Sequence, residues 1–312
     1  MKVLVTCPPM LGMLAEFIRP AAKKGINLIP ATTTQVLSEG ELIDLLPQFD
    51  GWIIGDDPAT RKVFEAGRQG ALKAAVKWGV GVDNVDFDAC RDLEIPIINT
   101  PNMFGGEVAD LAIGYMLGLA RQSYYIDREI RINNAWPKPP GMSMEGKVIG
   151  VVGFGDIGFQ TIKRLVGFDV TVQVYDPGVE GSRGLGFVQA LTWPEKLAEV
   201  DFLIFTCNLN AGNQHMLNAD ILSRLKPGVK VINVARGPLI DEQALTDALL
   251  SGHVSAAALD VFEQEPLPES SRMRGMSQCI FGSHNGSNTT EGVRRASKEA
   301  INKIAGFLNA EK

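Results

Sequence analysis

Four titratable or charged side chains lie in short loops in the second half of the chain, close after apolar runs. Arg236 follows "VINVA", Asp260 follows "SAAAL", and His284 follows "CIFGS", with Glu265 between the last two. A histidine beside a carboxylate can exchange a proton near neutral pH, and an arginine fork can bind two oxygens of a carboxylate. Together they predict acid/base chemistry on a small anion. Each alone is equally explained as a surface ion pair, a solvated acid or a loop cap.

A glycine-rich loop follows an earlier apolar run, "KVIGVV". Gly153, Gly155 and Gly158 have the spacing G-x-G-x-x-G and open a helix-like pattern. This spacing permits a tight turn, close approach of backbone amides to a pyrophosphate, and tight helix packing. Asp176 ends the next run and could accept hydrogen bonds from a ribose, although a turn before Pro177 also explains it. We therefore predict a bound dinucleotide.

The cofactor is expected to be NAD. A carboxylate at Asp176 would repel the 2′-phosphate of NADP, which makes NADP the less favoured cofactor. Arg183, a few residues further on, is the one group in this stretch that could favour NADP.

These loops need strands to position them. Short β-branched runs alternate with helix-like spacers from end to end, which is typical of parallel sheets built from βαβ units. The expected strands cover residues 2–6, 27–30, 51–55, 74–78, 96–100, 148–153, 170–175, 201–205, 229–234, 255–260 and 279–282.

The strands form two series, and 312 residues is long for one core, so we expect two α/β domains. The predicted substrate-binding domain is discontinuous and covers residues 1–98 and 288–312, because an amphipathic helix near the C-terminus can pack back on it. The predicted NAD-binding domain covers residues 99–287. Residues 103–130 are expected to form one long apolar helix, followed by a Pro/Gly-rich loop over 135–147.

Composition excludes several classes of protein. The net charge of −6, without a basic cluster, argues against nucleic-acid binding. No apolar run reaches about 18 residues, so no membrane span is expected, and the N-terminus lacks a cleavage site, which predicts a cytoplasmic protein. Scattered cysteines predict reduced thiols and no metal site: Cys7, Cys90, Cys207 and Cys279.

The whole chain resembles the D-isomer-specific 2-hydroxyacid dehydrogenases. The matching phrases occur in the family's order: "GVGVDNVD" (79–86), "NTPN" (99–102), "VADLA" (108–112), "GVVGFGDIG" (150–158), "NVARGPLID" (233–241) and "ALDVFEQEP" (258–266). The resemblance implies a flavodoxin-like and an NAD-binding Rossmann domain with the active site in the cleft between them. It implies an NAD-dependent oxidoreductase that acts on the CH–OH group of small 2-hydroxy or 2-keto acids.

The resemblance also implies residue roles. Arg236 would bind the substrate's carboxylate and carbonyl oxygen, His284 would be the general acid/base, and Glu265 would polarise it. Val80 and Gly81 would offer backbone amides to the substrate carboxylate. The cofactor contacts implied are Gly153, Gly155, Asp156, Ile157, Gly158, Asp176, Cys207, Val234, Ala235, Asp260 (to the nicotinamide carboxamide) and Gly286.

Two further expectations stay open. Lys77 could meet a second anionic group of the substrate, or it could be a solvent-facing strand end. Relatives are usually homodimers through the nucleotide domain; the apolar helix at 103–121 fits that interface, and a buried core helix is the alternative.

The chain departs from the family pattern in the histidine loop, where "NGSN" follows His284, in "VADLA", and in "TCNLN" (206–210), which lies where relatives have an H-x-P segment. Ser283 replaces the usual proline before the histidine, and Asp110 replaces a glutamate. Asp56 and Asp57 lie where phosphoglycerate dehydrogenases usually have an arginine, and they would repel a phosphate. Phosphoglycerate dehydrogenase is thus an alternative specific activity, and an NAD(H)-sensing corepressor-like protein is an alternative class. Formate dehydrogenases are disfavoured because Glu265 is intact.

Overall fold

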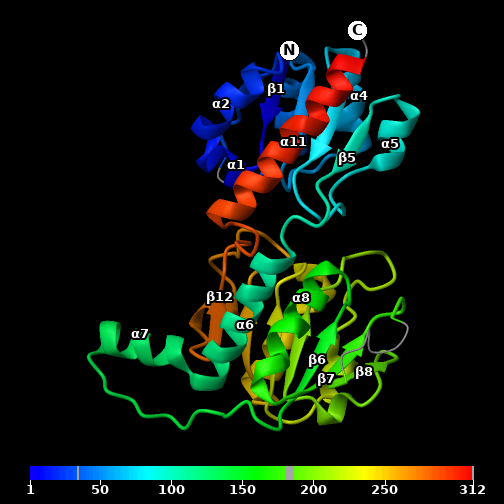
Figure 1. Ribbon diagram of the computed structural model, residues 1–312. Coiled ribbons are helices and arrows are strands. Elements are labelled where there is room, and N and C mark those ends of the chain that lie inside the picture. Colours follow the sequence, from blue (N-terminus) through cyan, green and yellow to red (C-terminus); the bar gives the residue numbers. More distant parts are fainter. Residues whose placement is uncertain (34, 180–185, 311–312) are drawn as a thin grey trace. The chain divides into compact units, whose positions relative to one another are not determined.

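The computed structural model describes residues 1–33, 35–179 and 186–310 (Figure 1). The chain divides into two compact units, residues 1–104 with 287–312 and residues 105–286. Each unit is a parallel β-sheet with helices packed on its faces.

The first unit has a five-stranded parallel sheet in the order β2-β1-β3-β4-β5. Its strands are β1 (Lys2–Val5), β2 (Asn27–Pro30), β3 (Gly51–Ile54), β4 (Ala74–Lys77) and β5 (Ile97–Asn99). Its helices are α1 (Pro8–Gly12), α2 (Leu14–Ala22), α3 (Glu39–Leu45), η1 (Leu46–Gln48), α4 (Arg61–Gln69), α5 (Phe87–Asp92) and α11 (Thr290–Ala310). The strand order reverses between β1 and β3, where open α/β sheets bind their ligands.

The second unit has a seven-stranded parallel sheet in the order β12-β11-β10-β9-β6-β7-β8. Its strands are β6 (Val148–Val152), β7 (Thr171–Tyr175), β8 (Val188–Leu191), β9 (Phe202–Phe205), β10 (Val229–Asn233), β11 (Val254–Leu259) and β12 (Cys279–Phe281). Its helices are α6 (Gly105–Arg121), α7 (Ser123–Asn133), α8 (Asp156–Leu165), η2 (Val166–Phe168), η3 (Leu197–Glu199), α9 (Ala219–Ser223), η4 (Gly237–Leu239), α10 (Glu242–Ser251) and η5 (Arg272–Gly275). The order reverses between β6 and β9.

Helix α11 completes the first unit although it comes from the C-terminus. A Cβ atom added to Gly51 of β3 would lie 3.2 Å from side-chain atoms of Ile304 and Leu308, so the helix packs directly on the sheet. Trp78 donates a hydrogen bond to Ser297 Oγ across 3.1 Å. The buried face of α11 therefore serves as the apolar cover of β3 and β4.

The predicted α/β class and its two parallel sheets are confirmed. Two element predictions are wrong. The single helix over 103–130 is two helices, because Gln122 has a left-handed backbone (φ 53°) between α6 and α7. Strand β8 was not predicted; it is a short edge strand with two exposed residues, so it lacks the apolar run that marks the central strands.

The junctions between the units lie after Phe104 and after Gly286, compared with the predicted 98/99 and 287/288. Residues 99–104 pack within the first unit: Gly79 N donates to Thr100 Oγ1 at 2.8 Å, and the Phe104 ring lies 4.9 Å from that of Trp78.

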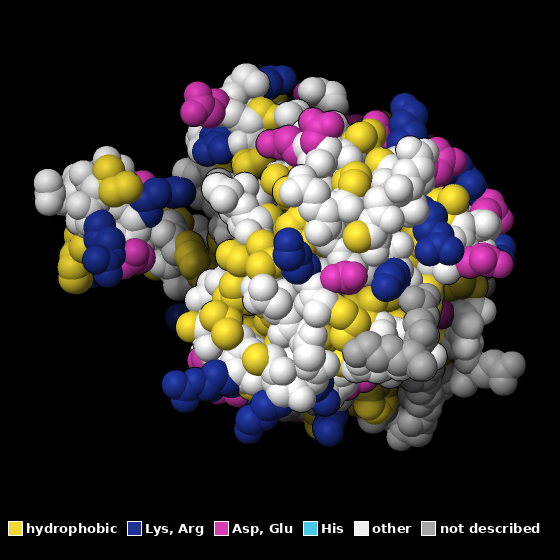
Figure 2. All heavy atoms as spheres, turned by 90° about the horizontal axis from the view of Figure 1, so that it is seen from above, with side chains coloured by type: hydrophobic (Ala, Val, Ile, Leu, Met, Phe, Trp, Pro, Cys, Tyr) yellow, Lys and Arg dark blue, Asp and Glu magenta, His cyan; other side chains and the backbone are white. Residues whose placement is uncertain are grey.

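The charge of the described surface is mixed. On the face drawn in Figure 2, basic and acidic side chains are interspersed with apolar ones. Among the described helices, none combines the length and the apolar character that crossing a bilayer requires.

Candidate active site

A histidine and a glutamate predicted to act together are in contact in the second unit. His284 Nδ1 lies 2.8 Å from Glu265 Oε2, and both side chains are about one-fifth exposed, 21% and 22%. The other oxygen of Glu265 accepts a hydrogen bond from Phe262 N at 3.0 Å. The fixed carboxylate thereby orients the imidazole, and Nε2 is the ring nitrogen that Glu265 does not engage.

The loop that carries the histidine is folded around a buried carboxylate. Asp260 is 1% exposed, and its side chain accepts from Asn285 N at 3.1 Å and from Gly286 N at 2.8 Å. His284 N donates to Asp260 O at 2.6 Å, with His284 in the left-handed region (φ 55°). The backbone around the histidine is therefore held by amide contacts to Asp260, which do not depend on the side chains that flank it.

Two residues that sequence reasoning missed support this carboxylate. Tyr115 of α6 donates to Asp260 Oδ1 at 3.4 Å, and burial raises the pKa of the Tyr115 phenol, which keeps it a neutral donor. A Cβ on Gly282 would lie 2.0 Å from Asp260 Oδ1, so only glycine leaves room there. The phrase "FGSH" contained the glycine, but nothing local indicated what it would contact.

The arginine predicted to bind substrate comes from the loop after β10. Asn233, at the end of β10, fixes this loop: its Oδ1 accepts from Ala235 N at 3.0 Å and its Nδ2 donates to Arg236 O at 2.8 Å. A Cβ on Gly237 would lie 1.9 Å from the Phe262 carbonyl carbon. The arginine loop therefore packs directly on the loop that leads to the glutamate.

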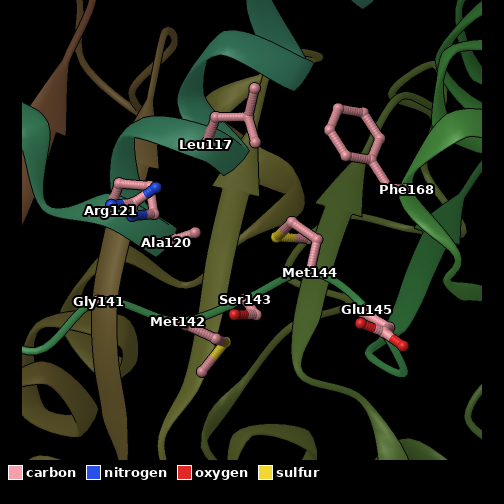
Figure 3. Close-up of a pocket in the computed structure, with 9 residues that line it drawn as sticks. All are labelled: Leu117, Ala120, Arg121, Gly141, Met142, Ser143, Met144, Glu145 and Phe168. Carbon is pink, nitrogen blue, oxygen red and sulfur yellow. The ribbon is translucent and has the colours of Figure 1, made fainter.

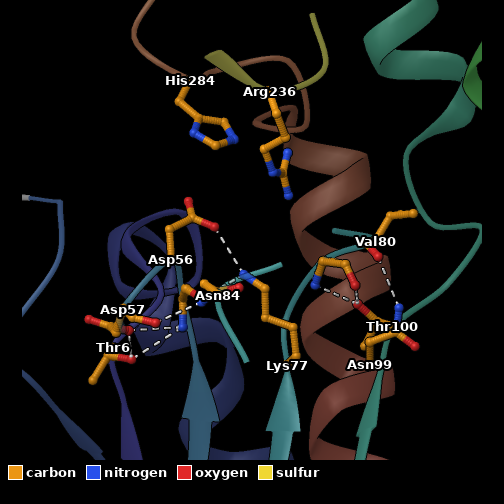
Figure 4. A network of polar contacts seen from close by, with 12 residues as sticks. Thr6, Asp56, Asp57, Lys77, Val80, Asn84, Asn99, Thr100, Arg236 and His284 are labelled. Atoms are coloured by element: carbon orange, nitrogen blue, oxygen red, sulfur yellow. Dashed lines mark hydrogen bonds and ion pairs between the residues drawn. The ribbon is translucent and has the colours of Figure 1, made fainter. Parts of the chain in front are cut away.

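The structure thus brings the predicted chemistry to one edge of the second sheet. The loops of Arg236, Glu265 and His284 follow β10, β11 and β12, which are neighbours in the sheet. Figure 4 shows the side chains of Arg236 and His284 extending from their loops on the same side. An arginine fork beside a carboxylate-paired imidazole can hold an oxyanion and move a proton at the neighbouring atom.

The three glycines of the predicted dinucleotide loop have different surroundings. A Cβ on Gly153 (φ 101°) would lie 2.6 Å from Cys207 N, and one on Gly158 would lie 2.1 Å from Gly153 O. A Cβ on Gly155 would meet nothing within 4 Å. Two glycines are therefore needed for packing, whereas the middle one faces open space at the N-terminus of α8, where an anion can approach the backbone.

The acid predicted to contact a ribose lies beside this loop. Asp176, directly after β7, accepts from Phe154 N at 2.7 Å and from Gly178 N at 2.7 Å. Both oxygens are thus fixed by backbone amides and keep capacity to accept further hydrogen bonds. Arg183, which could have favoured NADP, lies outside the described residues.

The remaining predicted cofactor residues lie near the same edge. Burial raises the pKa of the Cys207 thiol to about 11, so the thiol beside the glycine loop is neutral. The Asp156 carboxylate, in the first turn of α8, is directed at the start of α6, where a Cβ on Gly105 would lie 2.2 Å away. The others are Ile157 in the first turn of α8, and Val234 and Ala235 in the loop after β10.

One departure from the family pattern has a structural explanation. Arg164 of α8 donates from Nε to Asp110 Oδ1 of α6 across 2.6 Å. The shorter acid therefore ties two packed helices of the second unit together.

In the first unit, the predicted substrate loop follows β4. Asn99 Nδ2 donates to Val80 O at 3.1 Å, and the Thr100 hydroxyl bonds to Gly79, so β5 pins the loop (Figure 4). Within the described part of the chain, the amides of Val80 and Gly81 donate to no protein acceptor.

Lys77, at the end of β4, does not face solvent, so that alternative is wrong. Its side chain is 2% exposed, and its Nζ contacts Asp56 Oδ1 at 2.9 Å and Gly55 O at 2.5 Å.

Comparison with known proteins decides the family. The family model described as "D-isomer specific 2-hydroxyacid dehydrogenase, NAD binding domain" matches residues 113–286. A hydroxypyruvate reductase of Thermotoga maritima is 33% identical over 278 residues, covering 87% of this chain and 89% of that one. The chain belongs to the D-isomer-specific 2-hydroxyacid dehydrogenase family. As a member of it, the chain is an NAD-dependent oxidoreductase acting on the CH–OH group of hydroxy acids.

Two further proteins are similar to this chain over most of its length. A chloroplastic D-3-phosphoglycerate dehydrogenase of Arabidopsis thaliana is 33% identical over 296 residues, covering 92% of this chain and 47% of that one. The chain thus spans about half the length of that relative. A formate dehydrogenase of Staphylococcus aureus, solved in complex with NAD, superposes with a TM-score of 0.85 at 25% identity, covering 100% of this chain and 97% of that one.

The geometry of the dehydrogenase's glycine loop fits the family's cofactor. The matched region is the NAD-binding domain, so NAD is the cofactor, as the glycine loop predicted. The open space at Gly155 leaves room for a pyrophosphate, and the fixed Asp176 carboxylate suits ribose hydroxyls. Among the described residues, no group of His, Cys, Asp or Glu is placed to hold a metal ion.

A cavity of about 550 Å³ in the second unit, drawn in Figure 3, lies away from the sheet edge that carries the glycine loop. Leu117 and Arg121 line it from the end of α6, Met142 and Met144 from the segment before β6, and Phe168 from the segment before β7. It therefore lies at the amino ends of the strands, whereas the glycine loop lies at their carboxyl ends.

Proposed function

We propose that this dehydrogenase reduces a small 2-keto acid with NADH, and oxidises the corresponding D-2-hydroxy acid, using His284, Glu265 and Arg236. The observation that carries the proposal is the 2.8 Å pair of His284 and Glu265. The Arg236 loop packs on the same segment, so an acid/base and a carboxylate-binding group occupy one edge of the sheet.

The proton chemistry follows from the orientation of the imidazole. Reduction of a keto group leaves an alkoxide that must take a proton, and His284 holds that proton at Nε2. Glu265 keeps the proton on Nδ1 in place and stabilises the imidazolium. In the oxidative direction the same Nε2 takes the hydroxyl proton. The fixed contact of Glu265 with Phe262 N keeps the imidazole in this orientation in both directions.

Substrate binding is assigned to one side chain and two main-chain amides. The Arg236 guanidinium binds the carboxylate and the keto oxygen together, because its planar fork matches two adjacent oxygens. The amides of Val80 and Gly81 add hydrogen bonds to the carboxylate. Lys77 lies directly before this loop but is already paired with Asp56.

NAD supplies or accepts the hydride when it is bound. The amides of the glycine loop and the N-terminus of α8 hold its pyrophosphate, and Asp176 accepts hydrogen bonds from the adenosine ribose. The same carboxylate disfavours NADP by repulsion of the 2′-phosphate. The further contacts we assign to the cofactor are Gly153, Gly155, Asp156, Ile157, Gly158, Cys207, Val234, Ala235, Asp260 and Gly286.

The test is NADH consumption with a panel of 2-keto acids: glyoxylate, hydroxypyruvate, pyruvate, branched-chain and aromatic keto acids, and phosphohydroxypyruvate. We expect at least one acid to be reduced to the D-hydroxy acid. Binding of NADH without reduction of any acid would instead favour an NAD(H)-sensing protein.

We further propose that the dehydrogenase is a cytoplasmic homodimer. Helix α6 is largely buried in its own unit, so the interface is assigned to α7, which has no buried residue and extends away from the sheet of its unit (Figure 1). Exposed apolar side chains on and after α7 support this interface; Ile132 is 69% exposed and Trp136 is 77% exposed. Light scattering should give twice the 33.7 kDa mass of one chain, and the mass of a single chain would contradict the homodimer.

The proposed cytoplasmic location is supported by four cysteines that form no disulfide.

A further inference from the structure

The histidine loop, residues 282–286, rests against one side of helix α6. A Cβ added to Gly282 would lie 2.4 Å from the hydroxyl oxygen of Tyr115, and one added to Gly286 would lie 3.4 Å from Val108 Cγ2. Both α6 side chains are buried, at 4% exposure for the tyrosine and 6% for the valine. Helix α6 is therefore in contact with both ends of the histidine loop.

Tyr115 also reaches this loop through a buried carboxylate. Its hydroxyl donates to Asp260 Oδ1 across 3.4 Å, and among the residues that the structure describes it contacts no other acceptor. Burial raises the pKa of the phenol, so Tyr115 is a neutral donor beside the carboxylate. Because Asp260 is 1% exposed, its carboxylate is held by donors of the chain itself.

The same carboxylate holds the main chain around the histidine. Asn285 N donates to Asp260 Oδ1 at 3.1 Å, and Gly286 N donates to Oδ2 at 2.8 Å. His284 has a left-handed backbone (φ 55°), a conformation that a residue with a side chain keeps only where its surroundings hold it. The backbone that carries the imidazole is therefore fixed from Asp260, in addition to the contact of the ring with Glu265.

We propose that Tyr115 is a positioning residue for the proton transfer by His284. Its hydroxyl fixes Oδ1 of Asp260, and the carboxylate in turn fixes the main chain of residues 284–286. Without the hydroxyl, Oδ1 would lose its side-chain donor, the carboxylate could turn, and the imidazole would leave the geometry that proton transfer requires. This inference rests on the proposed function, because it concerns the histidine to which we assign the acid/base role.

The experiment uses Tyr115→Phe, which removes the hydroxyl and keeps the ring. With a 2-keto acid that wild-type enzyme reduces, we expect kcat to fall about tenfold, while KM and the Kd for NADH stay within about threefold of wild type. The ratio of kcat in H₂O to kcat in D₂O should rise, because proton transfer becomes slower relative to the other steps. A loss of stability alone would not change this ratio.

Tyr175→Phe is the matched control, because Tyr175 is another buried tyrosine of the same unit. Its hydroxyl lies 2.9 Å from Gln173 Oε1 and 2.9 Å from the Glu195 carbonyl oxygen, and it has no contact with the histidine loop. We expect this variant to lower the melting temperature at least as much as Tyr115→Phe does, with kcat within about twofold of wild type and an unchanged solvent isotope ratio.

An unchanged kcat in Tyr115→Phe, a fall in kcat without a rise in the isotope ratio, or an equal fall in Tyr175→Phe would overturn the proposal. Hydrogen exchange of the amides of residues 285 and 286 tests the link through Asp260 without any substrate. It should become faster in Tyr115→Phe only, and unchanged exchange there would also overturn the proposal. If wild type reduces no 2-keto acid at all, the proposed function itself fails, which is a different result from any of these.

Discussion

The two parallel sheets each reverse strand order once, and the loops at these two points are built in opposite ways. In the second unit, the loop after β6 presents mostly backbone atoms. Gly155 of this loop faces open space, and the carboxylate of the nearby Asp176 is held by two backbone amides. In the first unit, the segments at the carboxyl ends of β3 and β4, next to β1, carry charged side chains. Asp57 is buried there, and Lys77 is paired with Asp56.

The difference fits the roles that we propose for the two loops. A pyrophosphate is the same in every turnover, and bare amides at a helix N-terminus bind it without side chains. Discrimination among substrates requires differences in charge and shape, which only side chains supply. We therefore expect changes in the second unit to alter turnover and cofactor binding, and changes in the first unit to alter stability or substrate preference.

The largest expected effect separates chemistry from binding. His284→Ala should lower kcat by at least roughly 10²-fold, because no other group is assigned to protonate the alkoxide, with the Kd for NADH nearly unchanged. Steady-state kinetics and fluorescence titration of NADH measure the two quantities.

The matched control is a second histidine–glutamate pair in the same unit. His215 Nε2 lies 3.1 Å from Glu263 Oε1, with the histidine side chain 41% exposed. His215→Ala should keep kcat within a few-fold of wild type. Near-native turnover in His284→Ala would remove that residue from its assigned role.

The next effect concerns the first unit. Thr6→Val should lower the free energy of unfolding by roughly 2 kcal/mol, because Asp57, Trp52 Nε1 and Gly55 N all lose the Thr6 hydroxyl as a partner. Chemical denaturation measures the loss. NADH affinity of the folded variant should not change, and a large change there would contradict the division of roles between the units.

A third prediction compares two glycines of one loop. Gly155→Ala should keep the melting temperature but weaken NADH binding about tenfold, since its methyl group would project into open space beside the pyrophosphate. Gly158→Ala should lower the melting temperature, because its Cβ would lie 2.1 Å from Gly153 O. Calorimetry and NADH titration distinguish the two. Equal loss of stability in both variants would show that Gly155 serves packing alone.

The smallest expected effect is on cofactor choice. Asp176→Ala should reduce the preference for NADH over NADPH about fivefold, because the repulsion of the 2′-phosphate is lost while the glycine loop remains. The ratio of kcat/KM for the two cofactors measures it. A ratio equal to that of wild type would show that another residue discriminates between NADH and NADPH.

Local sequence patterns predicted the two parallel sheets, and together with the family resemblance they identified the residues of the candidate site. The glycine spacing, the position of Asp176 after its strand, and the order of Arg236, Glu265 and His284 are all features of short segments. The contacts that join distant segments were not predictable. Tyr115 and Asp260 are 145 residues apart, and no periodicity links them.

The same limit explains the errors in the first unit and in the helices. Lys77 ends a strand, and the pattern does not say which way its side chain turns, so its pairing with Asp56 was missed. The break at Gln122 between α6 and α7 has no glycine or proline to mark it.

The most direct test of the account is NADH oxidation by wild-type enzyme at neutral pH with 2-keto acids whose side chains are uncharged, with chiral analysis of the product. The account predicts NADH consumption that depends on the keto acid and yields the D-2-hydroxy acid. Tight NADH binding with no consumption across the whole panel would contradict it.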